Sequence, residues 1–360
     1  MIEQTSLLHP KFTLNGFSHN ASTLMDAAYS LIKEGDPFEL VIGDFLMDWL
    51  NDSNTITVKT SGTTGTPKLQ TFTRQQLVAS AKLTGDYFEL SPGQSVLMCL
   101  PANYIAGKMM IVRAMVLGLD LHFVAPISTP IPYEREFDFT AMVPMQLEAS
   151  VKQLDQIDQL IVGGAPVSQE LIREISEVRT NIYETYGMTE TLTHVAVKKL
   201  NHTLSGFAEE TFTALPGIEF ETDARSCLVV TASHLDLHKW VTNDVVTLLN
   251  NKEFSWKGRI DHVINSGAVK VHPEYVEAIL RDAFQCEVVV IGVPDPQLGE
   301  RVLGIVETKD SIDKYAKILE SIDALDAFEK PRELRAITEI PRNDSGKIDR
   351  NTTLEHLNLK

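Results

Sequence analysis

The chain has 360 residues, of which 43% are hydrophobic and 22% are charged, and its formal net charge at pH 7 is −17. This length fits about two domains and is sufficient to bury a core without disulfides. The negative charge argues against a nucleic-acid partner or an acidic membrane surface, but small anionic ligands remain open because a few local cations outweigh a global field.

Alternating helices and strands are predicted through the first half of the chain. Hydrophobic periodicity predicts helices over residues 21–34, 73–88 and 105–118, and a further helix from Ser168. Strands are predicted over residues 55–60, 95–101, 121–126, 158–166 and 180–187. Because strands alternate with helices from residue 55 to 187, we expect a large layered α/β domain with mainly parallel strands.

The pattern changes after residue 205. Residues 217–233 and 244–258 predict antiparallel hairpins, the second turning at Asn250–Asn251. A new α+β unit then begins, with a hairpin over 262–271, helices over 272–284 and 311–322, and strands over 286–295 and 301–309. We therefore expect two domains, residues 1–260 and 261–360, with a boundary near Asp261.

Cysteine usage and the apolar segments bear on the compartment. Cys99, Cys227 and Cys286 are widely spaced and odd in number, which favours a reducing compartment. The opening MIEQTSLLHP lacks the layout of a signal peptide. The most apolar stretch, residues 109–127, carries Arg113 and an aspartate, so it predicts a buried helix, a turn and a strand rather than a membrane span. We expect a cytoplasmic protein with no membrane partner.

The strongest local motif is SGTTGTPK at residues 61–68, directly after a predicted strand. Small residues let backbone N–H and hydroxyl groups approach phosphate oxygens, and Lys68 adds a positive charge. The motif is not a Walker A loop, because Pro67 precedes the lysine and Leu69 follows it. A flexible Ser/Thr/Gly linker is the alternative interpretation of this segment alone.

This motif resembles the phosphate loop of the adenylate-forming superfamily, which includes acyl-CoA synthetases, luciferases and the adenylation domains of peptide synthetases. Four more segments resemble that family's motifs in its order: YGMTET (186–191), TNDVVTL (242–248), KGRIDHVINSGAVKVHPEYVE (257–277) and PRNDSGKIDR (341–350). The chain is thereby identified as a member. The resemblance implies a large AMP-binding N-terminal domain and a smaller, mobile C-terminal domain.

The resemblance also implies ATP and Mg²⁺ as ligands. Glu190 would hold Mg²⁺, Thr189 would bond the α-phosphate and Tyr186 would stack on adenine. The other implied nucleotide contacts are Ser61, Gly62, Thr63, Thr64, Gly65 and Lys68 in the phosphate loop, Gly163, Gly164 and Ala165 opposite the adenine, Gly187, Asp244 on the ribose hydroxyls, and Arg259. Taken singly, Asp244 is more often a turn residue, Glu190 a helix-start carboxylate and Tyr186 a core aromatic.

Two further residues take roles in the two-step reaction that the resemblance implies. Lys347 would neutralise charge as the substrate carboxylate attacks the α-phosphate, although its position alone suggests a solvated surface lysine. Asp261 falls at the family's hinge. One orientation of the C-terminal domain would bring in Lys347 for adenylation, and the other would present the hairpin near Gly267 for thioester formation.

The segments LPANYIAGKMM and SGAVKVHPEYVE resemble o-succinylbenzoate–CoA ligases of the menaquinone pathway, with coenzyme A as co-substrate. Only 60 residues precede Ser61, so we expect the N-terminal subdomain to be shortened. The acyl-pocket candidates are Asn103, Tyr104, Lys108, Thr193 and His194. Lys108, Thr193 and His194 are candidate partners for a second carboxylate; a surface lysine and an ordinary strand histidine are the alternatives. The family often has a histidine where this chain has Asn103–Gly107.

Three hypotheses follow for function. The first is an ATP-dependent acid–CoA ligase that acts on 2-succinylbenzoate, as a monomer or homodimer. The second is another small adenylate-forming ligase that uses an aryl or fatty acid or loads a carrier-protein thiol. The third is a catalytically silent nucleotide-binding homologue, against which the joint presence of Lys68, Glu190, Asp244, Arg259 and Lys347 weighs.

Overall fold

The computed structural model describes residues 7–59, 69–133, 135–203, 210–267, 269–342 and 348–357. The chain divides into two compact units: unit 1 is Met1–Val167, Leu171–Glu219 and Thr231–Lys239, and unit 2 is Ser168–Glu170, Phe220–Val230 and Trp240–Lys360. This division assigns residues 240–260 to the same unit as the C-terminal residues. The boundary near Asp261 therefore stays a prediction.

Unit 1 begins with a short hairpin, β1 (Thr13–Leu14) and β2 (Phe17–Ser18), and two packed helices, α1 (Ala21–Glu34) and α2 (Pro37–Leu50). The predicted helix over 21–34 is confirmed. It begins where Asn20 caps it, because the Asn20 side chain accepts from the Thr23 N–H at 3.0 Å and the Thr23 hydroxyl accepts from the Asn20 N–H at 3.0 Å. The α2 helix, which the sequence analysis did not predict, buries Trp49 completely.

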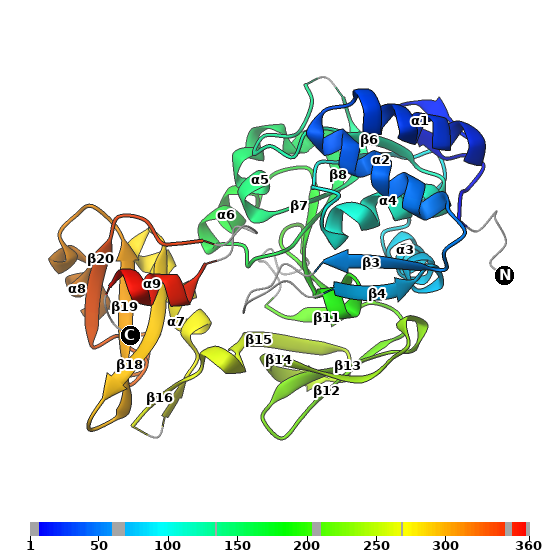
Figure 1. Cartoon of the computed structure of the whole chain (residues 1–360). Coiled ribbons are helices and arrows are strands. Elements are labelled where there is room, and N and C mark those ends of the chain that lie inside the picture. Colours follow the sequence, from blue (N-terminus) through cyan, green and yellow to red (C-terminus); the bar gives the residue numbers. More distant parts are fainter. Residues whose placement is uncertain are drawn as a thin grey trace. The chain divides into compact units, whose positions relative to one another are not determined.

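The main sheet of unit 1 has the strand order β11-β10-β9-β8-β7-β5-β6-β1-β2. Figure 1 labels β6, β7, β8 and β11 of this sheet. Its strands are β5 (Ser95–Met98), β6 (Asp120–Phe123), β7 (Phe137–Met142), β8 (Ile157–Val162), β9 (Asn181–Gly187), β10 (His194–Lys199) and β11 (Phe212–Ala214). Neighbours from β6 to β9 run parallel, as predicted, whereas β10 is antiparallel to β9 and β11. Separate from this sheet, β3 (Thr55–Lys59) pairs with β4 (Leu69–Thr73).

Helices connect and cover these strands. They are α3 (Arg74–Tyr87), α4 (Ile105–Leu117), α5 (Pro144–Ala149) and α6 (Gln169–Glu174), with short 3₁₀ turns η2 (Val151–Gln156), η3 (Thr189–Thr191) and η4 (Ser233–Leu235). The α4 helix packs on α3 and ends, as predicted, at Gly118, which adopts φ +75°. A left-handed residue at this position favours glycine. The helix predicted from Ser168 is shorter than expected and ends at Glu174.

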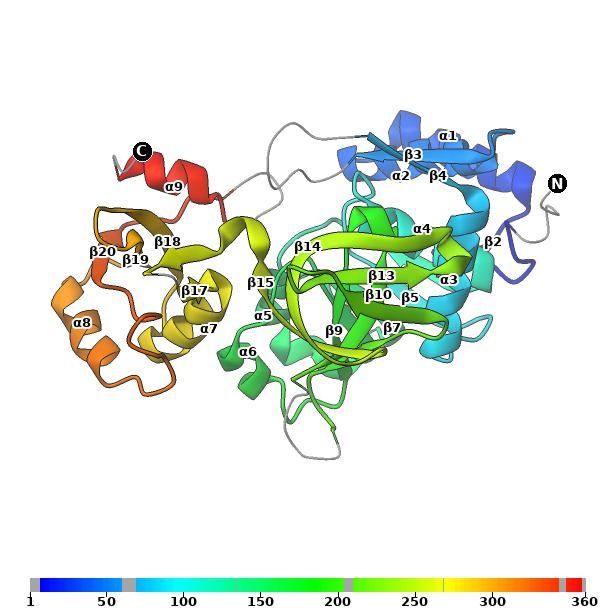
Figure 2. The same cartoon turned by 90° about the horizontal axis from the view of Figure 1, so that it is seen from below.

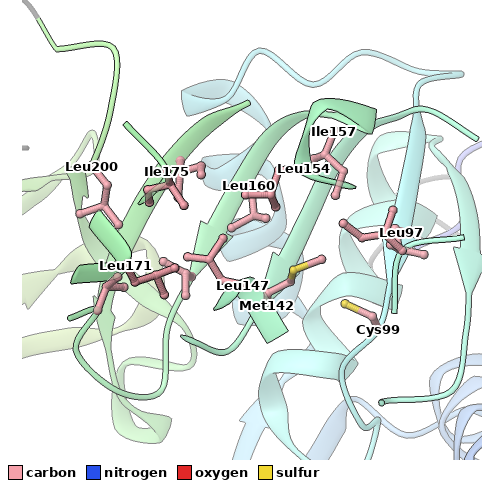
Figure 3. Packing of buried hydrophobic residues seen from close by; sticks show 14 of the residues in the cluster. Leu97, Cys99, Met142, Leu147, Leu154, Ile157, Leu160, Leu171, Ile175 and Leu200 are labelled. Atoms are coloured by element: carbon pink, nitrogen blue, oxygen red, sulfur yellow. The ribbon is translucent and has the colours of Figure 1, made fainter. Parts of the chain in front are cut away.

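A buried apolar cluster packs against the parallel strands (Figure 3). Leu97 of β5, Leu160 of β8 and Ile182 of β9 are fully buried, and Leu147 of α5 packs with them. Burying one leucine side chain contributes about 2 kcal/mol. The strands whose ends carry the candidate site are therefore anchored in a packed apolar core.

Unit 2 contains most of a run of neighbouring strands in the order β12 (Ile218–Thr222), β13 (Cys227–Ala232), β14 (Leu237–Asn250) and β15 (Glu253–Arg259), of which β14 and β15 are antiparallel. The β14 and β15 strands run side by side as a hairpin in Figure 2, with Asn250 opposite Glu253. This confirms the hairpin predicted to turn at Asn250–Asn251. Within the described residues, none of the helices is long and apolar enough to cross a membrane.

The C-terminal part of unit 2 is a small α+β layer, as predicted. Its elements are η5 (Ile260–His262), β16 (Ile264–Ser266), β17 (Val269–Val271), α7 (Pro273–Phe284), β18 (Val288–Asp295), β19 (Gly299–Glu307), α8 (Ile312–Glu320), β20 (Glu333–Ile337) and α9 (Arg350–His356). The strands follow the order β17-β16-β19-β18, and β20 pairs with β19. Val288 and Val290 enter the core beneath α7 and α8, whereas Val289 and Ile291 enter a second core that Leu354 of α9 contacts.

Candidate functional site

Several predicted site residues in unit 1 follow the carboxyl ends of neighbouring parallel strands. Asn103 and Tyr104 come after β5, Gly163 and Gly164 after β8, and Glu190 after β9. Strands β5, β7, β8 and β9 pair in parallel, so the residues after them lie along one edge of the sheet. This edge is where open α/β sheets bind ligands.

The glycine pair after β8 is required by local geometry. A Cβ atom on Gly163 would lie 2.5 Å from the Thr185 hydroxyl oxygen, and Gly164 adopts φ +91°. The Thr185 hydroxyl donates to the Val162 carbonyl at 3.1 Å, which holds it against the glycine. A larger residue at either position would displace the turn. Ala165 follows on the exposed surface, so this turn presents backbone rather than bulk.

The YGMTET segment forms a tight turn after β9. Thr189 and Glu190 lie in η3, and the Met188 N–H donates to the Thr191 hydroxyl at 3.0 Å. Leu192 adopts φ +67° and the chain returns as β10. A Cβ atom on Gly187 would lie 2.4 Å from the Thr193 carbonyl oxygen. The closeness of the returning strand therefore explains this glycine.

Glu190 is half-buried at that turn. No group of three or more His, Cys, Asp or Glu side chains suited to a metal occurs in the described parts of the chain. Mg²⁺ is usually bound through one or two carboxylates together with substrate phosphates. A single accessible glutamate therefore fits a nucleotide-borne Mg²⁺ and does not fit an all-protein cage.

Tyr186 lies on β9 and is 9% exposed. Its ring centroid is 5.8 Å from that of Phe212 on β11, with an interplanar angle of 56°. The stack of Tyr186 on adenine stays a prediction.

Arg113 is a buried cation that sequence reasoning did not assign to the site. It lies on α4, is 2% exposed, and donates from Nη2 to the Thr193 hydroxyl at 3.0 Å. Burial lowers its pKa to about 10. Its Nε has no hydrogen-bond partner, and no carboxylate pairs with it among the described residues. The signal was present: Arg113 is the only charged residue between Met109 and Leu119.

His194 completes this buried group. Its Nδ1 lies 3.2 Å from the Thr193 hydroxyl, and its Nε2 finds no hydrogen-bond partner in the part of the chain that the structure describes. Burial, together with the positive charge of Arg113, holds the pKa of His194 well below its usual value. The imidazole is therefore neutral near pH 7. Arg113, Thr193 and His194 form one polar cluster inside the apolar unit, which we term the buried cation cluster.

The Lys108 side chain, also on α4, has different neighbours from Arg113. Its Nζ lies 4.6 Å from the centroid of the Phe45 ring on α2. Burial lowers the pKa of Lys108, and Asp48 and Asp44 of α2 oppose this effect. Arg113, rather than Lys108, contacts Thr193.

Asp244, the predicted ribose ligand, lies in unit 2 on β14 and is 8% exposed. Trp256 of β15 donates from Nε1 to Asp244 Oδ1 at 3.2 Å. The Asp244 N–H donates to the Thr242 hydroxyl at 3.0 Å. Arg259 pairs with Asp244 across the hairpin, so the two predicted nucleotide contacts of this unit are neighbours.

Asp261 is held by two side chains from that hairpin. Arg259 Nη2 donates to Asp261 Oδ2 at 2.7 Å, and Asn243 Nδ2 donates to the same oxygen at 3.1 Å. Although burial opposes it, these contacts lower the pKa of Asp261. Burial also opposes the charge of Arg259, but Asp261 and Asp244 raise its pKa. The hinge role of Asp261 stays a prediction.

A buried ionic network follows Asp261. His262 Nδ1 bonds Glu274 Oε1, and Arg350 Nη2 lies 3.6 Å from the same carboxylate oxygen. Arg350 binds Glu277 through two bonds of 2.6 and 2.9 Å, and Glu277 is 2% exposed. The Val290 N–H also donates to Glu277 Oε1 at 2.7 Å. Arg350 therefore joins α9 to α7 and β18.

The remaining predicted residues lie outside the described residues. They are Ser61, Gly62, Thr63, Thr64, Gly65 and Lys68 of the phosphate loop, and Lys347. Their roles stay as the resemblance implies.

Comparison with known families identifies the class. The model for the AMP-binding enzyme family matches residues 51–218, and the model for the AMP-binding enzyme C-terminal domain matches residues 276–347. The chain belongs to the AMP-binding enzyme family. The predicted family and its α/β fold are confirmed. Within the family, the chain lies among the acid–CoA ligases, that is, the AMP-forming acyl-CoA synthetases.

The chain is similar to a probable 2-succinylbenzoate–CoA ligase of Mycobacterium tuberculosis, with 27% identity over 339 residues that cover 84% of each chain. It is 28% identical to a 4-chlorobenzoate–CoA ligase of an Arthrobacter species, a match that covers 58% of this chain and 45% of that protein.

Among solved structures, the chain is 33% identical to an acyl-CoA synthetase (AMP-forming)/AMP-acid ligase II-like protein of Dyadobacter fermentans, with a TM-score of 0.60. This match covers 92% of this chain and 98% of that one. The o-succinylbenzoate CoA synthetase of Bacillus subtilis, solved with its acyl-adenylate intermediate, shares the fold at 19% identity and a TM-score of 0.71. That match covers 82% of this chain and 68% of the other.

Proposed function

We propose that this protein activates 2-succinylbenzoate as its coenzyme A thioester at the expense of ATP. A carboxylate oxygen of the acid attacks the α-phosphorus and pyrophosphate leaves, which gives the acyl-adenylate. The coenzyme A thiolate then attacks the acyl carbonyl carbon and AMP leaves. Family membership and the names of the relatives support this reaction.

The observation that carries the choice of a dicarboxylic acid is Arg113. A buried guanidinium without a carboxylate is costly, because desolvation is not repaid by an opposite charge. A substrate carboxylate would supply that charge and could also accept from Thr193. The neutral His194 would offer or accept a further hydrogen bond without adding repulsion. A monocarboxylic acid consumed at its only carboxylate would leave Arg113 unpaired.

We assign the nucleotide roles as the resemblance implies. Glu190 would hold Mg²⁺, which when bound neutralises charge on the phosphates. Thr189 would donate to the α-phosphate, and Asp244 would accept from the ribose hydroxyls. Lys68 and Lys347 would bring positive charge to the phosphates.

We place the reaction in menaquinone biosynthesis and in the cytoplasm. Cys99, Cys227 and Cys286 are all free thiols, which supports a reducing compartment. The enzyme is proposed to act as a monomer or homodimer on small-molecule substrates, without nucleic acid or membrane.

The deciding experiment measures pyrophosphate release with Mg·ATP across a panel of acids, with and without coenzyme A, and detects the thioester by mass. The panel contains 2-succinylbenzoate and two monoacids that each lack one of its carboxylates, 4-oxo-4-phenylbutanoate and 2-butanoylbenzoate. We expect release and a coenzyme A-dependent thioester with the diacid alone. If the folded protein releases pyrophosphate with none of the acids in the panel, ligase activity is contradicted.

A second candidate substrate class is an aryl monoacid. The similarity to 4-chlorobenzoate–CoA ligase and to indoleacetate–CoA ligase supports it. Turnover of 4-chlorobenzoate or indoleacetate in preference to 2-succinylbenzoate would retain the ligase and reject the diacid.

A further inference from the structure

His194 lies at the sheet edge that carries the candidate site. It is the first residue of β10, and because β10 runs antiparallel to β9, it lies opposite Gly187 at the carboxyl end of β9. His194 is 6% exposed, and its ring lies edge-to-face with that of Phe88, with 6.4 Å between the centroids. The histidine therefore brings a polar group to a buried, partly apolar place beside the predicted nucleotide turn.

Hydrogen bonds within the buried cation cluster fix the tautomer of His194. The Arg113 guanidinium can only donate, so the Thr193 hydroxyl oxygen accepts from it at 3.0 Å. The proton of that hydroxyl then points to His194 Nδ1, 3.2 Å away. The ring is neutral, because burial and the charge of Arg113 hold the pKa of His194 well below its usual value. A neutral imidazole whose Nδ1 accepts carries its proton on Nε2.

The Nε2–H group is a buried donor that meets no acceptor among the residues that the structure describes. Leaving such a donor without an acceptor is costly. The two ring nitrogens point in divergent directions, so Nε2 faces away from the Thr193 hydroxyl. A substrate carboxylate held by Arg113 and Thr193 would therefore leave Nε2 to another polar group of the same molecule. A neutral acceptor suits this donor, because a second carboxylate would favour a charged imidazolium beside Arg113.

We propose that His194 determines specificity for the ketone of the substrate, by donating from Nε2 to the keto oxygen. The inference rests on the proposed function and deepens it. In 2-succinylbenzoate the ketone is attached to the ring carbon next to the one that bears the aromatic carboxylate, so Arg113 and His194 would bind neighbouring groups. An acid without the ketone would leave the Nε2–H donor unpaired, and the enzyme would select against it.

The test compares 2-succinylbenzoate with 4-(2-carboxyphenyl)butanoate, which has both carboxylates and a methylene group in place of the ketone. Pyrophosphate release gives kcat/KM for each diacid. The unaltered protein should prefer the keto diacid by at least about tenfold, the effect of one buried hydrogen bond. His194→Leu, which removes the donor, should lower kcat/KM for the keto diacid roughly tenfold and for the other diacid by less than about twofold. His194→Gln, whose amide can donate, should retain part of the preference.

His234→Leu is the matched control. The Nε2 of His234 also lacks a partner within the described segments, but His234 lies on η4, outside the buried cation cluster. This variant should change neither rate. An equal loss with both diacids in His194→Leu would overturn the proposal, since it indicates packing of the ring rather than a bond to the ketone. Equal turnover of the two diacids by the unaltered protein would overturn it as well. Failure of the proposed function appears separately, as pyrophosphate release with neither diacid.

Discussion

Each unit contains a buried arginine, and the two arginines differ in the groups that surround them. Arg350 in unit 2 meets Glu277 through two hydrogen bonds and Glu274 at 3.6 Å. Arg113 in unit 1 meets the Thr193 hydroxyl and the Met110 sulfur, and no carboxylate within the described segments. Burial disfavours the charge of both, yet the carboxylates raise the pKa of Arg350, whereas burial alone lowers that of Arg113 to about 10.

The difference distinguishes Arg350, whose charge has a structural role, from Arg113, whose charge we propose to bind a ligand. Arg350 has its counter-charges inside the fold, and it ties three elements together. No carboxylate of the described residues compensates the charge of Arg113, which supports our proposal that a substrate carboxylate binds there. Substitutions at the two positions should therefore have opposite consequences for stability and for catalysis.

The largest expected effect is on stability, at Arg350. Arg350→Met would leave Glu277 buried without its cation, while Glu274 keeps its bond to His262. We expect this change to cost about 3–5 kcal/mol of unfolding free energy. Urea denaturation measures this loss. Arg350→Met combined with Glu277→Gln should recover part of it, because one uncompensated charge is then removed. Arg179→Met, at an exposed pair with Asp158, is the matched control and should change little. A similarly small loss for Arg350→Met would reject the structural role.

Arg113→Met should behave in the opposite way. Removing a buried unpaired charge should leave the unfolding free energy unchanged or raise it by about 1 kcal/mol. The same change should lower kcat/KM for 2-succinylbenzoate roughly 100-fold, as expected when one partner of a buried charge pair is removed. Steady-state assays with the diacid and the two monoacids measure this. An equal loss with the monoacids would exclude a second-carboxylate contact.

His194 predicts a pH dependence of stability. Its folded-state pKa lies well below 6.5, so below pH 6.5 the unfolded chain binds a proton that the folded protein does not. Stability should therefore fall with decreasing pH, by up to about 1.4 kcal/mol per pH unit from this group. Urea titrations at pH 7.5, 6.5 and 5.5 measure the slope, and His194→Gln should reduce it. An unchanged slope in that variant would show that other groups dominate the pH dependence of stability. The comparison variant is His234→Gln.

The smallest effect is expected at Asn243, whose amide holds Asp261. Asn243→Gly removes this contact. If Asp261 is the hinge, the ratio of the adenylation and thioester half-reaction rates should shift by roughly twofold, since the bond is exposed. Single-turnover measurements of each half-reaction test this. Equal changes in both rates would separate Asn243 from the hinge.

Local patterns predicted much of the fold. Helical periodicity and Gly118 located α4 and its end, and the Asn250–Asn251 turn located the β14–β15 hairpin. The α2 helix was missed because PFELVIGDFLMDWL is apolar on most sides, which leaves no clear stripe for a periodicity argument. That this segment is a helix becomes clear only from its packing against α1.

The candidate site was less accessible to sequence reasoning. Lys108 and Arg113 are five residues apart on α4, and at 3.6 residues per turn such positions project about 140° apart. Sequence alone did not indicate which of them faces Thr193, a residue 80 positions later. The Trp256–Asp244 bond likewise depends on a bulge, which shifts the register by one residue and has no signature in the motifs.

The alternation of core residues along β18 has a further consequence. Val288 and Val290 face one core while Val289 and Ile291 face another. A one-residue insertion in such a strand exchanges the two sets of side chains, because each residue then points to the opposite face. Both cores would be repacked at once and neither could compensate for the other. We therefore expect length variation among relatives to be confined to the loops that flank β18, while the strand itself keeps its length.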